Sequence, residues 1–85
     1  MGVLLAAVLL LTACTSKAQK AVEKVELGQK YLTEQNYTEA VASFTEAIGL
    51  DPENIPAYMG RAQAYTGLKQ YDDAKADYTT AIEKT

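Results

Sequence analysis

The sequence repeats itself with a fixed period, and this constrains the fold more than any other feature. When residues 21–51 are paired with residues 55–85, eight of the 31 pairs are identical. The identical pairs are Gln29/Gln63, Tyr31/Tyr65, Tyr37/Tyr71, Ala40/Ala74, Ala42/Ala76, Thr45/Thr79, Ala47/Ala81 and Ile48/Ile82. A period between 20 and 50 residues is the signature of stacked supersecondary units. The chain is therefore expected to build two similar units that pack against each other.

Each unit has the apolar periodicity of two α-helices. In the first unit, the apolar and small residues are Ala21, Val25, Gly28, Tyr31 and Leu32, followed by Tyr37, Ala40, Val41, Phe44, Ala47 and Ile48. Their i, i+3, i+4, i+7 spacing places each set on one helical stripe. The first two helices are therefore expected at about residues 18–35 and 37–48. A third helix is expected to end at about residue 68, and a fourth to cover residues 71–84.

Local signals fit these helix limits. Asn36 is a candidate N-cap for the second helix, with Glu39 three residues later as a capping-box partner. The stretch 49–52, which reads Gly-Leu-Asp-Pro, is expected to end that helix. Asn54 is a candidate cap for the third helix, and Pro56 is tolerated in its first turn.

Aromatic and small residues recur at matching places in both units. The first unit has Leu27-Gly28…Tyr31…Tyr37…Ala40…Phe44…Ala47…Pro52, and the second has Tyr58…Arg61-Ala62…Tyr65…Tyr71…Ala74…Tyr78…Ala81. This pattern resembles the tetratricopeptide repeat over residues 21–85. The resemblance implies an all-α fold of two tandem helix–turn–helix repeats, 21–54 and 55–85, in a short right-handed α-solenoid. One departure is Lys24, where the family usually has the aromatic residue that Tyr58 supplies in the second repeat.

The repeated small and aromatic residues are expected to pack rather than to do chemistry. Small residues let paired helices approach closely, and aromatic rings fill the space around the crossings. The expected packing residues are Gly28, Tyr31, Ala40, Phe44, Ala47, Ala62, Tyr65, Ala74, Tyr78 and Ala81.

The N-terminal segment has the features of a secretory signal. Residues 3–11 form an unbroken apolar run, which is shorter than the roughly 20 residues that a membrane-spanning helix needs. The run is followed by Ala13-Cys14, which resembles the lipobox of bacterial lipoproteins. The resemblance implies a signal peptide at 1–13, cleavage between Ala13 and Cys14, lipidation of Cys14, and a polar tether at 14–20. An ordinary secretory signal and a structural cysteine are the alternatives, and no Lys or Arg precedes Val3.

The lipobox reading predicts a location at the bacterial cell envelope. Acyl chains on Cys14 would anchor the protein in a membrane. The family rule then predicts the outer membrane for a Gram-negative source, because Thr15 is not the aspartate that often retains lipoproteins in the inner membrane. In a Gram-positive source, the extracytoplasmic face of the cell membrane is expected.

Composition narrows the classes of function. A net charge of −3 disfavours nucleic-acid binding, which needs a basic face. The chain has no His and one Cys, so neither a metal site nor a cofactor is expected. Glu34 and Glu39 are close enough in sequence to consider as a catalytic carboxylate pair, but they flank a predicted turn with no apolar pocket. The chain is therefore not expected to be an enzyme.

The resemblance implies that the first helix of each repeat lines a groove that binds a protein or peptide. By alignment with the family pattern, the groove side holds Val25, Gln29, Leu32, Thr33, Met59, Gln63, Thr66 and Gly67. Plain solvated positions without a role are the alternative for the two glutamines. Some family members hold the C-terminal carboxylate of a partner with Lys, Arg and Asn side chains in this groove. The matching positions in this chain include Val25, Gln29, Pro56 and Gly60, so this specificity is not expected.

The sequence thus predicts a membrane-anchored adaptor or scaffold for protein–protein interaction. The alternative is a fragment of a longer repeat protein, or a self-associating unit without a separate client. Two repeats bury a thin core, and Tyr78, Ala81 and Ile82 are expected to leave apolar area on the last helix. A homo-oligomer is therefore one expected way of covering that area.

Overall fold

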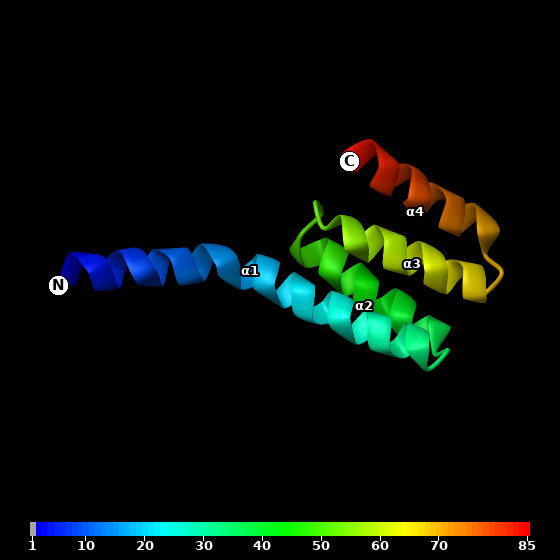
Figure 1. Cartoon of the computed structure of the whole chain (residues 1–85), viewed down its shortest axis with the longest axis horizontal. Coiled ribbons are helices and arrows are strands. Elements are labelled where there is room, and N and C mark those ends of the chain that lie inside the picture. Colours follow the sequence, from blue (N-terminus) through cyan, green and yellow to red (C-terminus); the bar gives the residue numbers. More distant parts are fainter. Residues whose placement is uncertain (1) are drawn as a thin grey trace.

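The computed structural model of the chain has four α-helices in sequence order (Figure 1). They are α1 (Gly2–Thr33), α2 (Tyr37–Leu50), α3 (Ile55–Gly67) and α4 (Tyr71–Lys84). The structure describes the backbone of residues 2–85 and the side chains of residues 17–85. No strand occurs in residues 2–85, so the prediction of an all-α fold is confirmed. The handedness of the solenoid stays a prediction.

The helices form two hairpins that lie side by side. α1 packs along α2, α4 packs along α3, and α3 also contacts both α2 and α1 (Figure 1). α1 begins well before the predicted start near residue 18, and it includes residues 14–20, for which a polar tether was predicted. The side chains of Ala13 and Cys14, the predicted cleavage and lipidation residues, lie outside the described part of the chain.

The core is built around one aromatic ring between two glycines. Phe44 on α2 is fully buried, and it is the largest side chain of which this is true in the described part of the chain. A Cβ atom on Gly28 of α1 would lie 2.7 Å from this ring, and a Cβ atom on Gly60 of α3 would overlap it. Both glycines are therefore required for the close approach of three helices. The buried residues around the ring are mostly small: Ala21, Val25, Ala40, Ala47, Ala57 and Ala64.

Most of the expected packing residues lie inside. Gly28, Ala40, Phe44, Ala47, Ala62, Ala74 and Ala81 are buried, and Tyr31 and Tyr65 are half-buried. Tyr78 differs, because 37% of its surface is exposed. The reason is its position on α4, which contacts only α3 within the described residues.

The two asparagines at helix starts behave differently. The side chain of Asn54 accepts a hydrogen bond from the backbone N–H of Ala57 at 3.1 Å, so its predicted capping role is confirmed. Asn36 occupies the N-cap position of α2, but its side chain makes no capping hydrogen bond. The predicted capping box with Glu39 is therefore wrong. The exposed backbone N–H groups of that first turn are left to water.

α1 and α3 end in the same way, with a non-glycine residue in the left-handed conformation. Gln35 has φ of 60°, and Lys69, its repeat counterpart, has φ of 63°. After α1, the N–H of Asn36 donates to the carbonyl of Tyr31 at 2.8 Å, and the N–H of Gln35 donates to that of Leu32 at 3.0 Å. These two bonds define a Schellman motif, in which glycine is the favoured residue at this position. The left-handed turn also explains why α1 ends before the predicted residue 35.

Glycine at these two positions is expected to stabilise the fold. Gln35→Gly and Lys69→Gly each remove the steric cost of a left-handed side chain, and the greater freedom of the unfolded chain offsets part of that gain. A net increase of about 0.5–1 kcal/mol in the free energy of unfolding is expected for each. Chemical denaturation followed by circular dichroism measures it. The matched control is Glu34→Gly, one residue earlier in a conformation open to any residue, which is expected to lower stability.

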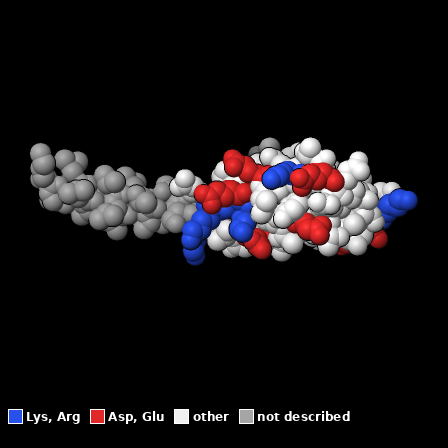
Figure 2. Space-filling view, turned by 90° about the horizontal axis from the view of Figure 1, so that it is seen from below, with Lys and Arg blue, Asp and Glu red and all other residues white. Residues whose placement is uncertain are grey.

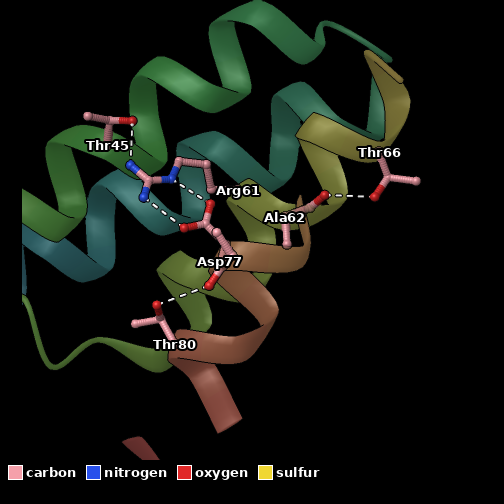
Figure 3. Close-up of polar contacts among 7 residues, drawn as sticks. Thr45, Arg61, Ala62, Thr66, Asp77 and Thr80 are labelled. Atoms are coloured by element: carbon pink, nitrogen blue, oxygen red, sulfur yellow. Dashed lines mark hydrogen bonds and ion pairs between the residues drawn. The ribbon is translucent and has the colours of Figure 1, made fainter. Parts of the chain in front are cut away.

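A buried ion pair joins three helices (Figure 3). Arg61 on α3 donates from Nε and Nη2 to the two carboxylate oxygens of Asp77 on α4, both at 2.8 Å. Its Nη1 also donates to Oγ1 of Thr45 on α2 at 3.1 Å. The bonds to Asp77 raise the pKa of Arg61 above its already high ordinary value, so this side chain stays charged. This contact was not predicted from the sequence, although an aspartate between Ala74 and Ala81 on the buried stripe was a signal for it.

Candidate protein-binding groove

A small groove lies between the first helices of the two repeats. Its volume is about 220 Å³, and its lining residues come from α1 and α3: Gln29, Leu32, Pro56, Met59, Gly60 and Gln63. Pockets for drug-sized ligands have about 300–1,000 Å³. The groove therefore fits one or two side chains of a longer partner rather than a whole cofactor.

The helix register explains how the groove forms. On α3, the lining residues 56, 59, 60 and 63 follow i, i+3, i+4, i+7 spacing, which puts them on one face. On α1, Gln29 and Leu32 are three residues apart on the facing stripe. Gly60 has no side chain to place in the groove, and a Cβ atom at this position would overlap the ring of Phe44.

The structure brings together four of the predicted groove residues. Gln29, Leu32, Met59 and Gln63 all line the groove. Pro56 and Gly60 were not among the predicted lining residues, although their spacing with Met59 and Gln63 on one helical face was a signal for them.

Val25 requires a correction. It belongs to the buried cluster around Phe44, with 6% of its surface exposed, and it cannot contact a partner in the groove. Gln29 is exposed and lies four residues after Val25, about 40° further round the helix. Val25 lies on the buried side of that stripe, with Ala21 and Gly28, against the cluster around Phe44.

The two threonines and Gly67 lie beside the groove rather than in it. The hydroxyl of Thr33 donates to the carbonyl of Gln29 at 3.1 Å, and the hydroxyl of Thr66 donates to that of Ala62 at 2.9 Å (Figure 3). Each donor is thus used within its own helix. Gly67 lies against the ring of Tyr37 on α2.

The groove is electrically neutral. Its lining has no charged side chain, and its apolar surface comes from Leu32, Met59 and Pro56. Gln29 and Gln63 are exposed and occupy the same position in the two repeats. Each amide has two donor hydrogens and an acceptor oxygen, which is the set needed to pair with an extended peptide backbone.

Charges lie elsewhere on the surface. On the face in Figure 2, acidic and basic side chains lie beside one another in several places, and uncharged surface covers much of the rest. A larger hollow of about 580 Å³ lies between α1 and the end of α2, lined by Lys20, Glu23, Lys24, Glu46, Gly49 and Leu50. Lys24 Nζ lies 2.9 Å from Glu46 Oε2, and this hydrogen bond raises the pKa of Lys24. A lysine held in its charged form is a poor general base.

Among residues 17–85, the positions of the side chains bring neither a carboxylate pair nor a group of metal ligands together as a site. Glu34 and Glu39, the carboxylates considered for catalysis, are both exposed to solvent. Among residues 17–85, no group of three His, Cys, Asp or Glu side chains is placed to hold a metal ion. Within the same residues, no helix has an apolar stretch long enough to cross a membrane.

Comparison with known proteins identifies the family. The family model described as "Tetratricopeptide repeat" matches residues 31–83. The match covers more than half of the chain, and the chain therefore belongs to the tetratricopeptide repeat family. Repeats of this family are modules for protein–protein interaction, and they are typically not enzymes.

Similar proteins come from several organisms. "DnaJ homolog subfamily C member 7" of Homo sapiens is 41% identical over 76 residues, which are 84% of this chain and 15% of that protein. "Small glutamine-rich tetratricopeptide repeat-containing protein beta" of Rattus norvegicus is 42% identical over 55 residues, 65% of this chain and 18% of that protein. "Translocon at the outer membrane of chloroplasts 64" of Pisum sativum is 40% identical over 67 residues, 79% of this chain and 11% of that protein. The chain thus spans less than a fifth of the length of each of these relatives.

Proposed function

We propose that the protein is an adaptor that binds an uncharged, extended segment of a protein partner in the groove between α1 and α3. The observation that carries this proposal is the pair of exposed amides, Gln29 and Gln63, on opposite walls of a neutral groove. Amide side chains pair with a peptide backbone, whose donors and acceptors alternate along an extended strand. Leu32 and Met59 supply apolar contact for the partner's side chains.

The chemistry of the groove disfavours an acidic partner. Recognition of a carboxylate uses charge-assisted hydrogen bonds from Lys or Arg, and the lining residues carry no positive charge. The positions at which some family members hold a carboxylate clamp include Val25, Gln29, Pro56 and Gly60 in this chain. Val25 is buried as well. An uncharged segment is the better fit.

The same proposal places the adaptor at a bacterial membrane. Its support is the sequence pattern of residues 3–14, an apolar run followed by Ala13-Cys14. Cleavage before Cys14 and acylation of its thiol would leave two or three acyl chains, which anchor stably where a single chain does not. The mechanism is recruitment: the lipid fixes the location, and the groove holds the client.

Two variants of the full chain separate binding from anchoring. Gln29→Ala combined with Gln63→Ala removes the two amides from the groove. Each hydrogen bond contributes about 1 kcal/mol, so affinity for the preferred uncharged peptide from a displayed peptide library should fall about tenfold to thirtyfold. Cys14→Ser should release the protein from the bacterial membrane fraction and abolish incorporation of a radiolabelled fatty acid.

Controls decide between the explanations. Gln19→Ala changes an exposed amide on α1 outside the groove and should leave peptide affinity unchanged. The groove variant should stay in the membrane fraction, and Cys14→Ser should keep its peptide affinity. Equal affinity of the groove variant and the parent protein would refute the groove. A chain that selects no peptide but sediments as an oligomer would point instead to self-association.

A further inference from the structure

The two repeats pack differently at Lys24 and its counterpart Tyr58. The ring of Tyr58 on α3 is buried, with 9% of its surface exposed. Its hydroxyl donates to the carbonyl of Pro52 at 2.8 Å, and Nζ of Lys84 on α4 lies 5.8 Å from the centre of the ring. In the second repeat, an aromatic ring therefore fills the space between the start of α3 and the end of α4.

The first repeat has a hollow at the matching place. The hollow of about 580 Å³ between α1 and the end of α2 is lined in part by Lys24 and Leu50, the counterparts of Tyr58 and Lys84. Gly49 also lines it, and a Cβ atom on this glycine would meet nothing within 4 Å beyond the backbone of its own helix. The first repeat thus has open space where the second repeat has a ring.

The hollow is larger than one ring because the chain runs differently before each repeat. Residues 51–54 form a turn before α3, and this turn supplies the carbonyl that accepts the hydrogen bond of the Tyr58 hydroxyl. At the matching residues 17–20, α1 continues as a helix, and Lys20 on this extension lines the hollow. No turn closes this side, so a side chain of another molecule can enter together with its backbone.

The charges beside the hollow suit an aromatic ring. Nζ of Lys24 lies 2.9 Å from Glu46 Oε2, and Nζ of Lys84 lies 2.9 Å from Glu53 Oε1. Lys84 makes this ion pair and lies over the Tyr58 ring at the same time. A cation is attracted to the negative face of an aromatic ring. Lys24 can therefore keep its ion pair and also contact a ring in the hollow.

A second copy of this chain is a poor source of that ring. Among the aromatic side chains of residues 17–85, Tyr71 exposes the largest fraction of its surface, 61%. Asp72 and Asp73 directly follow it. The charges of Lys20 and Glu23 at the hollow offset each other, so the two aspartates would meet no net positive charge. A ring in a segment without such carboxylates is the better fit.

We propose that the hollow between α1 and the end of α2 receives an aromatic side chain of a partner protein, carried in a segment without net negative charge. The ring takes the place in the first repeat that the Tyr58 ring fills in the second. This site is separate from the groove between α1 and α3. The two share no lining residue, and Lys24 and Gln29 point about 140° apart around α1.

Two uncharged tripeptides with blocked ends, Gly-Trp-Gly and Gly-Leu-Gly, test the proposal on the full chain, kept in solution with a mild detergent. We expect the tryptophan peptide to bind at millimolar concentration and to shift the NMR amide signals of residues 20–24 and 46–50. The leucine peptide should bind at least about threefold more weakly, because an aliphatic side chain has no negative face for a lysine to contact.

Variants that place a ring in the hollow locate the site. Gly49→Phe adds a ring to open space, and Lys24→Tyr reproduces the second repeat. Each should weaken binding of the tryptophan peptide about tenfold or more, because the hollow is already filled. Ala42→Phe and Lys30→Tyr add a ring at exposed positions of the same two helices outside the hollow and should leave binding unchanged. A retained helical circular dichroism signal shows that each variant is folded.

The proposal fails on any of three results. The first is the absence of shifts at residues 20–24 and 46–50 with the tryptophan peptide at millimolar concentration. The second is equal affinity for the two tripeptides, or unchanged affinity in both ring variants, because the hollow would then not select a ring. The third is an oligomer of the parent chain that Tyr71→Ser dissociates in sedimentation velocity, because a second copy would then occupy the hollow.

Discussion

Replacing Phe44 with alanine is expected to lower the free energy of unfolding by about 3–5 kcal/mol. The ring is fully buried and fills the space that Gly28 and Gly60 leave open on the two neighbouring helices. Glycine has no side chain that can move into the resulting cavity. Chains of this size have a total stability of roughly 4–10 kcal/mol, so a large fraction of the variant should be unfolded at 37 °C. Urea denaturation followed by circular dichroism at 222 nm measures the loss.

The repeat supplies a matched control for this change. Tyr78 is the counterpart of Phe44 in the second repeat, but 37% of its surface is exposed. Tyr78→Ala is expected to cost about 1 kcal/mol, because less apolar surface returns to water. Similar losses at the two positions would show that the ring of Phe44 is not the centre of the core.

Asp77→Ala is expected to destabilise the fold by about 3 kcal/mol, the second largest effect of a single change. Asp77 is buried, and both of its carboxylate oxygens accept hydrogen bonds from Arg61. Without the carboxylate, the guanidinium is left with Thr45 as its remaining hydrogen-bond partner among these residues. Part of the Arg61 side chain is solvent-exposed, which keeps the loss at the low end for a broken buried pair.

Two further variants isolate the cause. Combining Arg61→Met with Asp77→Leu removes both charges and should recover most of the stability, since apolar residues of similar size often replace a buried pair without loss. Lys84→Met breaks the ion pair with Glu53, whose carboxylate is largely exposed, and should change stability little. An Asp77→Ala variant as stable as Lys84→Met would mean that the buried pair contributes nothing to the fold.

The helices and their packing could be predicted from the sequence because they depend on local spacing. The stripe of Tyr37, Ala40, Phe44 and Ala47 follows directly from the helical period. Alignment with the family pattern placed Gln29 and Gln63 on the groove side, and both line the groove in the structure. Val25 was misplaced because neighbouring positions on one helix face different partners. A family pattern gives the approximate register but not which stripe is covered.

Other features depend on contacts between residues far apart in sequence. Arg61 and Asp77 are 16 residues apart on different helices, and the first repeat has Leu27 and Ser43 at the matching positions. The repeat comparison therefore gave no sign of the pair. The left-handed residues Gln35 and Lys69 were also missed, because neither is the glycine that usually marks such a turn.

The ring of Phe44 has a consequence for recognition as well as for stability. It is inserted between Gly28 on α1 and Gly60 on α3, and these two helices carry the opposite walls of the groove. The thickness of an aromatic ring therefore sets how far apart the walls stand. If the groove binds a client as proposed above, the distance between its walls is already set before binding, and little free energy would be lost to reorganisation of the protein. Selectivity in such a protein can consequently evolve at a residue that no client ever touches.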